Sequence, residues 1–189
     1  MTLSEAQRGM RAGLMGGFMG QMVSGVLWLG SAVLATLGYQ RTAMGFLVVA
    51  GFFIFPLTLL GLKAIGHRAT VAKDNPLNRL GMEAAFVLPL CLPLVGAAML
   101  YRLDWFYPAF MILVGAHYLP YATVYGMRMF YVLAGVLFTV GLVMGLWMHL
   151  PFSTGAWITA LVLFVFAFWG RMIAMRESGA ASTLPDARP

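Results

Sequence analysis

The sequence is dominated by six apolar stretches, each about as long as a membrane-crossing helix and separated from the next by a polar break. A helix needs about 20 mostly apolar residues to cross a bilayer. Hydrophobic residues make up 61% of the chain and charged residues 10%, against roughly 45–50% and about 25% in soluble domains. Since a core of this size cannot bury that excess, we predict an all-α membrane protein with six spans. The expected spans are 13–37, 43–62, 80–101, 105–125, 129–150 and 155–173.

The spans are expected to form one domain over residues 1–176. Residues 177–189 combine Gly, Ala, Ser and Pro with charges, a composition with too little apolar surface to fold. We therefore expect a disordered tail there. The only long connection between spans covers residues 64–78. Within it Asn75 is expected to cap the third span and Pro76 to occupy its first turn, with a plain loop turn as the alternative.

The basic residues predict the orientation of the spans. With a cytoplasmic N-terminus, ten of the twelve Lys and Arg residues lie on the inner side, and only Arg41 and Arg102 lie outside. Cytoplasmic loops carry an excess of Lys and Arg. We predict a bacterial inner (plasma) membrane protein with both termini in the cytoplasm. The net charge of +6 is spread singly over the ends of the spans, so the expected partner is the lipid bilayer and no nucleic acid.

Small residues recur along the first span. Gly13 and Gly17 form one ridge, and Gly16, Gly20 and Ser24 form another beside it. Small residues let membrane helices approach closely. The simpler interpretation is contact within the bundle, and the alternative is a homo-oligomer formed through Gly13, Gly17 and Gly20. The pair Gly141 and Gly145 gives the fifth span a shorter version of the same pattern.

A polar stripe follows the fourth span. His117, Tyr121 and Tyr125 recur at a spacing of four, Arg128 follows three residues later, and Tyr118 lies on the adjacent face. Residues at this spacing share one face of a helix. At about 1.5 Å per residue, His117 lies roughly 16 Å from Arg128 along the axis, near the middle of a hydrocarbon core about 30 Å thick. Ionisable groups at that depth are usually functional, so we predict a ligand site there.

Two further polar residues are candidates for the same site. The third and fourth spans are joined by a short turn and are expected to be antiparallel neighbours, so Glu83 is expected to face Tyr125 or Arg128. Gln21 in the first span is expected to line the same cavity. A purely structural interpretation is also open, in which His117 donates to a carbonyl freed by a nearby proline and Glu83 pairs with Arg128.

The sequence lacks the patterns that usually accompany catalysis or metal binding. The three histidines, His67, His117 and His149, are scattered, without a His-x-x-x-His pair or paired carboxylates. Cys91 is the only cysteine, which rules out a disulfide within one chain. We therefore expect no catalytic residue, no metal site and no cofactor.

One segment resembles a known protein family. The sequence Gly115-Ala116-His117-Tyr118-Leu119-Pro120-Tyr121 is similar to the signature of a family of uncharacterised bacterial membrane proteins. Weaker similarities are Phe55-Pro56-Leu57, Asn75-Pro76-Leu77 and the acidic loop before Trp105. The resemblance covers roughly residues 10–175 and implies a six-span fold without an established activity. The chain departs from it at Arg79 and Glu83, where a plainer glycine-rich start of the third span is expected.

The leading hypothesis is a small-molecule or ion binding or transport protein, with a polar site between the third and fourth spans that opens to the cytoplasm. One alternative is a structural or assembly subunit that docks other membrane helices. Another is a membrane-embedded lipid-modifying enzyme that uses His117 as a base. A cavity reaching His117 favours the first, solid packing with an exposed glycine face favours the second, and a nucleophile or metal beside His117 favours the third.

Overall fold

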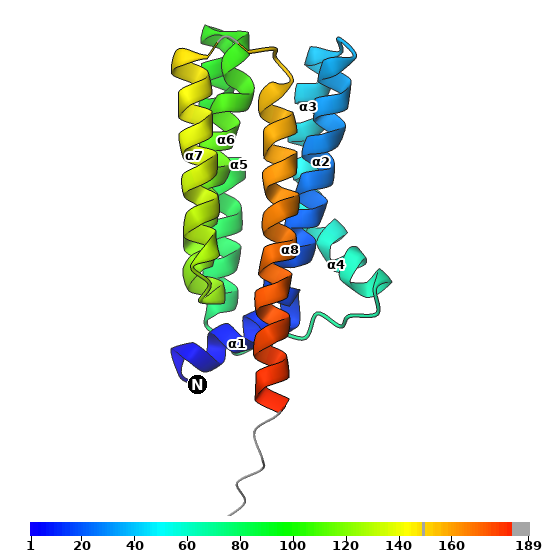
Figure 1. Ribbon diagram of the computed structural model, residues 1–189, viewed down its shortest axis with the longest axis vertical. Helices are drawn as coiled ribbons and strands as arrows, with labels where there is room; N and C mark the ends of the chain where they lie inside the picture. The colour runs from blue at the N-terminus through cyan, green and yellow to red at the C-terminus, as the bar shows by residue number, and fades with distance from the viewer. Residues whose placement is uncertain (149, 183–189) are drawn as a thin grey trace, which may run out of the picture.

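The computed structural model describes residues 1–148 and 150–182, and within them the chain is all-helical (Figure 1). Two short 3-10 turns, Met15–Gly17 and Leu103–Trp105, connect longer helices. The helices are α1 (Leu3–Leu14), α2 (Phe18–Thr36), α3 (Gln40–Gly51), α4 (Ile54–Ala64), α5 (Leu77–Tyr101), α6 (Phe106–Tyr125), α7 (Met129–Trp147) and α8 (Thr154–Ser182).

Four helical segments of the described residues are long and apolar enough to cross a membrane: Leu3–Thr36, Leu77–Tyr101, Met129–Trp147 and Thr154–Arg176. The bent pair α3 and α4 makes a fifth candidate if it counts as one span. α6 does not meet this criterion, although it is 20 residues long. Its histidine, four tyrosines and two prolines lower its mean hydropathy. The bundle shelters these residues, because α6 packs between α5 and α7 and is largely buried.

The predicted first span is divided by a sharp turn. Met15, Gly16 and Gly17 have φ values of 51°, 63° and 82°, in the left-handed region that glycine adopts readily. α2 therefore begins at Phe18, and α1 lies across the end of the bundle (Figure 1). A capping box between Thr2 and Glu5 starts α1.

Side chains of α1 bind the last turn of α6. Gln7 donates from Nε2 to the carbonyl oxygen of Thr123 at 2.8 Å, and Arg11 donates to the carbonyl of Tyr125. The last carbonyls of a helix lack partners within the helix. These two bonds therefore hold α1 at the end of α6, beneath the polar stripe.

Asn75 joins α1 to the start of α5. Its Oδ1 accepts a hydrogen bond from the N–H of Leu77 at 3.0 Å, and Pro76 has helical dihedral angles. Asn75 thus binds the first N–H of α5 as predicted, whereas Pro76 lies at the N-cap position, one residue before the helix. Asn75 also donates from Nδ2 to the carbonyl of Ala6 at 2.9 Å, which the sequence did not indicate.

The second predicted span, 43–62, is two helices rather than one. α3 and α4 meet at an angle of 68°. Pro56 has no N–H to donate to the carbonyl of Phe52, four residues earlier, so α3 cannot continue through this point. The proline lies in the first turn of α4, where a missing N–H is tolerated.

The other helices begin and end within a few residues of the predicted spans, except at the end of the chain. α8 continues to Ser182, well beyond the expected end at 173. It therefore enters the segment 177–189 that was expected to be disordered. Residues 183–189 and His149 lie outside the described residues.

Glycines bring several helices into close contact. A Cβ atom at Gly141 would lie 2.8 Å from the carbonyl oxygen of Pro108, and one at Gly145 would lie 3.1 Å from the ring of Trp105. The expected contact of this pair within the bundle is confirmed. Glycines of the first span also face the chain itself: a Cβ would lie 2.5 Å from Val71 at Gly13, 3.3 Å from Tyr125 at Gly17 and 3.7 Å from Thr58 at Gly20.

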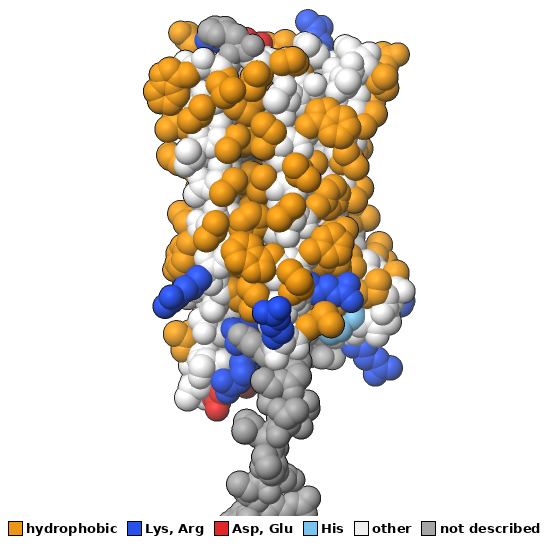
Figure 2. Space-filling view, viewed as in Figure 1, with side chains coloured by type: hydrophobic (Ala, Val, Ile, Leu, Met, Phe, Trp, Pro, Cys, Tyr) orange, Lys and Arg blue, Asp and Glu red, His pale blue; other side chains and the backbone are white. Residues whose placement is uncertain are grey.

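The outer surface is that of a membrane protein. Hydrophobic side chains cover the long wall of the bundle, and Lys and Arg gather at the end that carries α1 (Figure 2). Many large apolar side chains are exposed on this wall, among them Leu161, Val165 and Phe168 of α8. Such a surface requires a lipid environment.

Candidate functional site

A cavity of about 740 Å³ lies between α2, α3 and α4 on one side and α5 and α6 on the other. Residues of α1 and of the connection 65–76, including Met10, Leu14, Val71 and Lys73, line its end. The volume falls in the range of roughly 300–1,000 Å³ that is usual for small-molecule sites. The faces of α5 and α6 between which a site was predicted thus form one wall of a larger hollow.

His117 lines this cavity from α6 and is fixed by a hydrogen bond across to α5. Its Nδ1 lies 2.8 Å from the carbonyl oxygen of Ala84. A carbonyl only accepts, so Nδ1 carries the proton, and when the ring is neutral Nε2 presents a lone pair. Within the described residues Nε2 has no hydrogen-bond partner. A backbone carbonyl holds the ring, as the structural interpretation expected, but it belongs to Ala84 of α5 and does not lie four residues before a proline.

The tyrosines of the stripe form a stack that continues from His117 toward α1. The ring of Tyr121 lies 5.1 Å from that of His117 and 5.9 Å from that of Tyr125, and Phe130 of α7 lies 5.3 Å from Tyr125. Tyr121 donates to the carbonyl of Gly81 at 3.4 Å, a long bond. Tyr118 lines the cavity beside them. The structure thus brings together the four aromatic residues predicted from α6.

Gln21 lines the same cavity from α2, as predicted. It is only 2% exposed, and neither Oε1 nor Nε2 has a hydrogen-bond partner in the described part of the chain. An unpaired buried amide costs about 1–3 kcal/mol for each group left unsatisfied. A side chain that faces a hollow in this state is ready to bind a ligand or water.

Glu83 and Arg128 lie outside the cavity. Glu83 Oε1 lies 2.8 Å from Arg79 Nε, one turn away on α5, and both side chains are exposed. Arg128 is also exposed, between α6 and α7. The expected approach of Glu83 to Tyr125 or Arg128 does not occur, because Glu83 lies on the outer face of α5 rather than on the face that meets α6.

The polar and apolar parts of the lining are separated along the bundle axis. Polar groups lie toward the end that carries α1, together with apolar residues such as Met10, Leu14, Val71 and Met82. The polar groups are Gln21, Ser24, Thr58, Lys73, Asn78, His117, Tyr118, Tyr121 and Tyr125. The opposite part is apolar and is lined by Leu27, Trp28, Leu47, Leu92, Phe110 and Val114. Since α2, α5 and α6 all change from polar to apolar in the same direction, the cavity has a polar floor and an apolar upper chamber.

Sequence reasoning missed the contribution of α3 and α4. Thr58 and Val48 line the cavity because the break before Pro56 turns α4 away from α5 and leaves space between them. Pro56 was the available signal, since it marks where the helix has to end. The distance between α4 and α5 depends on how α4 packs on other helices, so the residues of α4 alone do not predict it.

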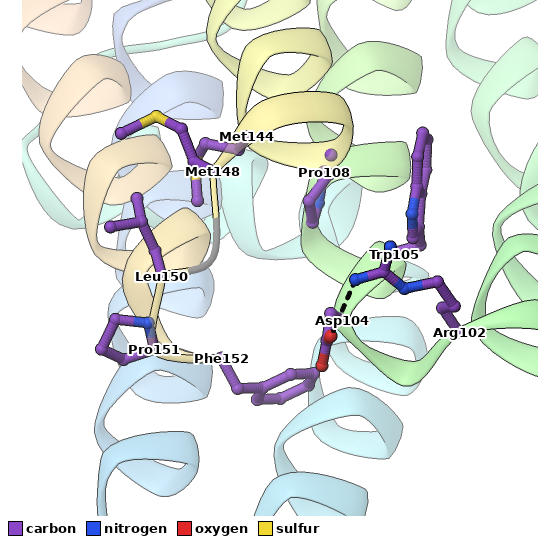
Figure 3. Close-up of a pocket in the computed structure, with 10 residues that line it drawn as sticks. Arg102, Asp104, Trp105, Pro108, Met144, Met148, Leu150, Pro151 and Phe152 are labelled. Carbon is purple, nitrogen blue, oxygen red and sulfur yellow. Dashed lines mark hydrogen bonds and ion pairs between the residues drawn. The ribbon is translucent and has the colours of Figure 1, made fainter.

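A second, smaller hollow of about 160 Å³ lies at the opposite end of the bundle (Figure 3). Arg102 and Asp104 form an ion pair at 3.3 Å on its edge, and Trp105 and Phe152 contribute aromatic walls. Both charged side chains are largely exposed. An exposed pair of this kind contributes little free energy, so this hollow is a weaker candidate site than the cavity.

Comparison with known proteins identifies a family for the chain. The model of a family of unknown function (DUF7010) matches residues 3–172. The chain belongs to this family. No curated protein and no solved structure matches the chain. This match is consistent with the expected resemblance to an uncharacterised family over about 10–175.

The DUF7010 match extends over the whole cavity. The lining residues run from Met10 to Phe130, inside the matched range 3–172. The polar floor and the apolar chamber therefore both lie in the part of the chain that the DUF7010 family model describes.

Proposed function

We propose that the chain is a six-span protein of a bacterial inner (plasma) membrane with both termini in the cytoplasm. The basic residues support this orientation. The structure describes eleven Lys and Arg residues. Nine of them lie in α1, in the connections at that end of the bundle, in the last turn of α4, in the first turn of α5 or in the C-terminal half of α8, and only Arg41 and Arg102 lie at the other end. α6 serves as one of the six spans, and α3 with α4 forms another, broken span.

The function that the site supports best is the binding and transport of a small organic molecule within the cavity. The observation that carries this proposal is Gln21, a buried amide without a partner that faces a hollow of about 740 Å³. The free Nε2 of His117 and the hydroxyls of the tyrosine stack converge on the same hollow. A hollow of this volume suits an organic molecule better than a single ion.

The same observations weigh against the two alternatives. In a structural subunit we would expect side chains to pack tightly around His117, whereas the ring lines a cavity. It also calls for an exposed face of Gly13, Gly17 and Gly20, whereas these residues face the chain itself. An enzyme calls for a reactive partner beside His117, and the nearest side chains in the cavity are tyrosines.

Native mass spectrometry of the protein extracted from its membrane tests the proposal. We expect a bound mass in the wild type that is lost in Gln21→Leu and in His117→Ala. The matched control is Ser31→Ala, because Ser31 is also a buried polar residue of α2 but is fully paired and lies outside the cavity. An identical set of bound masses in all four proteins, or none in any of them, contradicts the proposal.

A further inference from the structure

The division of the cavity into a polar floor and an apolar chamber indicates the kind of molecule that it holds. From Gly17 to Trp28 the lining of α2 rises about 16 Å, at 1.5 Å per residue. That is about half the thickness of a bilayer hydrocarbon core. A wholly polar ligand would leave the chamber empty, and a wholly apolar one would leave Gln21 unpaired.

The cavity also opens sideways, between α4 and α5. α3 and α4 pack on α2, and no extensive packing joins either helix to α5 within the described residues. Phe55 of α4 and Phe86 of α5 both line the cavity and yet are 55% and 58% exposed. A side chain that is exposed on the outer wall and also lines a cavity lies at its rim. In a bilayer this rim meets the acyl chains.

The other approach, from the cytoplasmic end, is covered. Met10 and Leu14 of α1 and Val71 of the connection 65–76 close the cavity at the outer side of the polar floor. His67 Nε2, 3.0 Å from the carbonyl oxygen of Ala12, joins that connection to α1. α1 is in turn held by Asn75 and by the bonds to the end of α6. The route from the lipid is therefore the more open of the two.

Resting on the proposed function, we infer that the ligand is an amphiphile dissolved in the bilayer, with an uncharged hydrogen-bonding head and a single apolar chain. It enters between α4 and α5. Its head lies on the floor among Gln21, His117 and Tyr121, and its chain fills the chamber beneath Trp28. The floor offers neutral groups: an amide that donates and accepts, a lone pair on Nε2 and hydroxyls. A charged head would find only Lys73 as a cationic lining residue among those described.

Fluorescence quenching of Trp28 tests this inference. Trp28 is 2% exposed and lines the chamber, so acyl chains outside the bundle do not touch it. The other four tryptophans, Trp105, Trp147, Trp157 and Trp169, are replaced by Phe. The protein is placed in vesicles of dioleoylphosphatidylcholine that carry monostearin, either unmodified or brominated in the middle of its chain. Bromine quenches tryptophan at near contact.

We expect roughly a twofold loss of Trp28 fluorescence with the brominated monoglyceride, because a membrane-dissolved probe in excess occupies most of the sites. The matched control carries its only tryptophan at position 166, as Phe166→Trp with Trp28→Phe. Phe166 is buried in α8 and does not line the cavity. Its fluorescence should not change.

A pair of neighbouring variants locates the chain within the chamber. Val48 lines the cavity, whereas Val49, the next residue of α3, is exposed on the outer wall. Val48→Phe fills part of the chamber and should abolish most of the quenching. Val49→Phe should leave it unchanged. Equal quenching in both variants places the probe outside the chamber and overturns the inference.

The outcomes separate this inference from the proposed function. If Trp28 is not quenched while native mass spectrometry finds a Gln21-dependent, water-soluble ligand, the amphiphile is wrong and the proposed function stands. If neither signal is found, both are wrong. Should the single-tryptophan protein fail to fold, the wild type is mixed with the brominated monoglyceride, and the isotope pattern of bromine in the bound mass decides.

Discussion

The two sides of the bundle differ in how closely their helices approach. On the side of α6, α7 and α8, glycines are in close contact: a Cβ at Gly115 would lie 2.9 Å from the carbonyl oxygen of Ala134, and one at Gly155 would lie 2.8 Å from Tyr107. On the side of α3, α4 and α5 such contacts are fewer: a Cβ at Gly45, Gly51 or Gly96 would meet nothing within 4 Å, and one at Gly61 would lie 2.6 Å from the sulfur of Met19. The same residue type thus serves close packing on one side and borders open space on the other.

Because of this difference, the polar groups of the site lie on the closely packed side, and the wall that faces them lies on the loosely packed side. His117 and the tyrosines stand on α6, which is fixed by its contacts with α7 and by the hydrogen bonds from α1. The facing wall consists of α3 and α4, whose extensive packing within the described residues is on α2. A binding site benefits when its polar groups are held in place, whereas the wall beside an entrance has to move. We therefore expect ligand entry to displace α4 rather than α6.

The largest effect is expected where the close packing is disturbed. Gly141→Ala should lower the free energy of unfolding by about 2–3 kcal/mol, because its Cβ would lie 2.8 Å from a backbone oxygen, that of Pro108. Gly135→Ala, on the same helix, is the control, since a Cβ there meets nothing within 4 Å. Thermal unfolding in detergent measures both. Equal effects at the two positions would mean that the packing of α6 on α7 is looser than described.

The close-packed side was also the part that the sequence predicted well. The spacing of His117, Tyr121 and Tyr125 placed them on one face, since a regular helix converts spacing directly into position. Glu83 was misplaced because its rotation about α5 depends on how α5 packs, and its spacing from Arg79 fits an ion pair on the outer face equally well. Local spacing determines neighbours on one helix but not which face meets the next helix.

The hollow side was predicted only in part, for a related reason. Pro56 marks the end of α3, but the angle of 68° follows from how α4 packs on α2. Met15 also has a left-handed backbone, which its residue type does not suggest, and so the first span was predicted to begin too early. The angle between two helices depends on how both of them pack, so neither sequence segment alone predicts it.

A smaller effect, of opposite sign at two positions of α2, should distinguish paired from unpaired buried groups. Ser31 donates to the carbonyl of Ala43 at 2.9 Å and lies 2.7 Å from the hydroxyl of Tyr107, so Ser31→Ala should lower the free energy of unfolding by about 1–2 kcal/mol. Gln21→Leu should raise it by about 1 kcal/mol, because the amide that it removes has no partner.

Chemical or thermal unfolding of the ligand-free protein measures both changes. A loss of stability in Gln21→Leu would mean that the amide is already satisfied, for instance by water in the cavity, and would remove the main support for a ligand at that position. A gain in stability together with a loss of the bound mass would show that Gln21 serves binding at the expense of the free protein. That result is the trade-off expected of a functional residue.

The smallest effect is expected on the open side itself. Gly45 lies in the interior of α3, and a Cβ there meets nothing within 4 Å. Gly45→Ala should therefore raise the free energy of unfolding by about 0.5–1 kcal/mol, because alanine loses less backbone entropy than glycine in a helix.

The same substitution should leave the bound mass unchanged if α3 keeps its distance from α5 in the loaded state. If unfolding is unaffected but binding is lost, α3 has to approach another helix at Gly45 when the ligand is bound. α3 would then move when the ligand binds, and the cavity would close around its ligand.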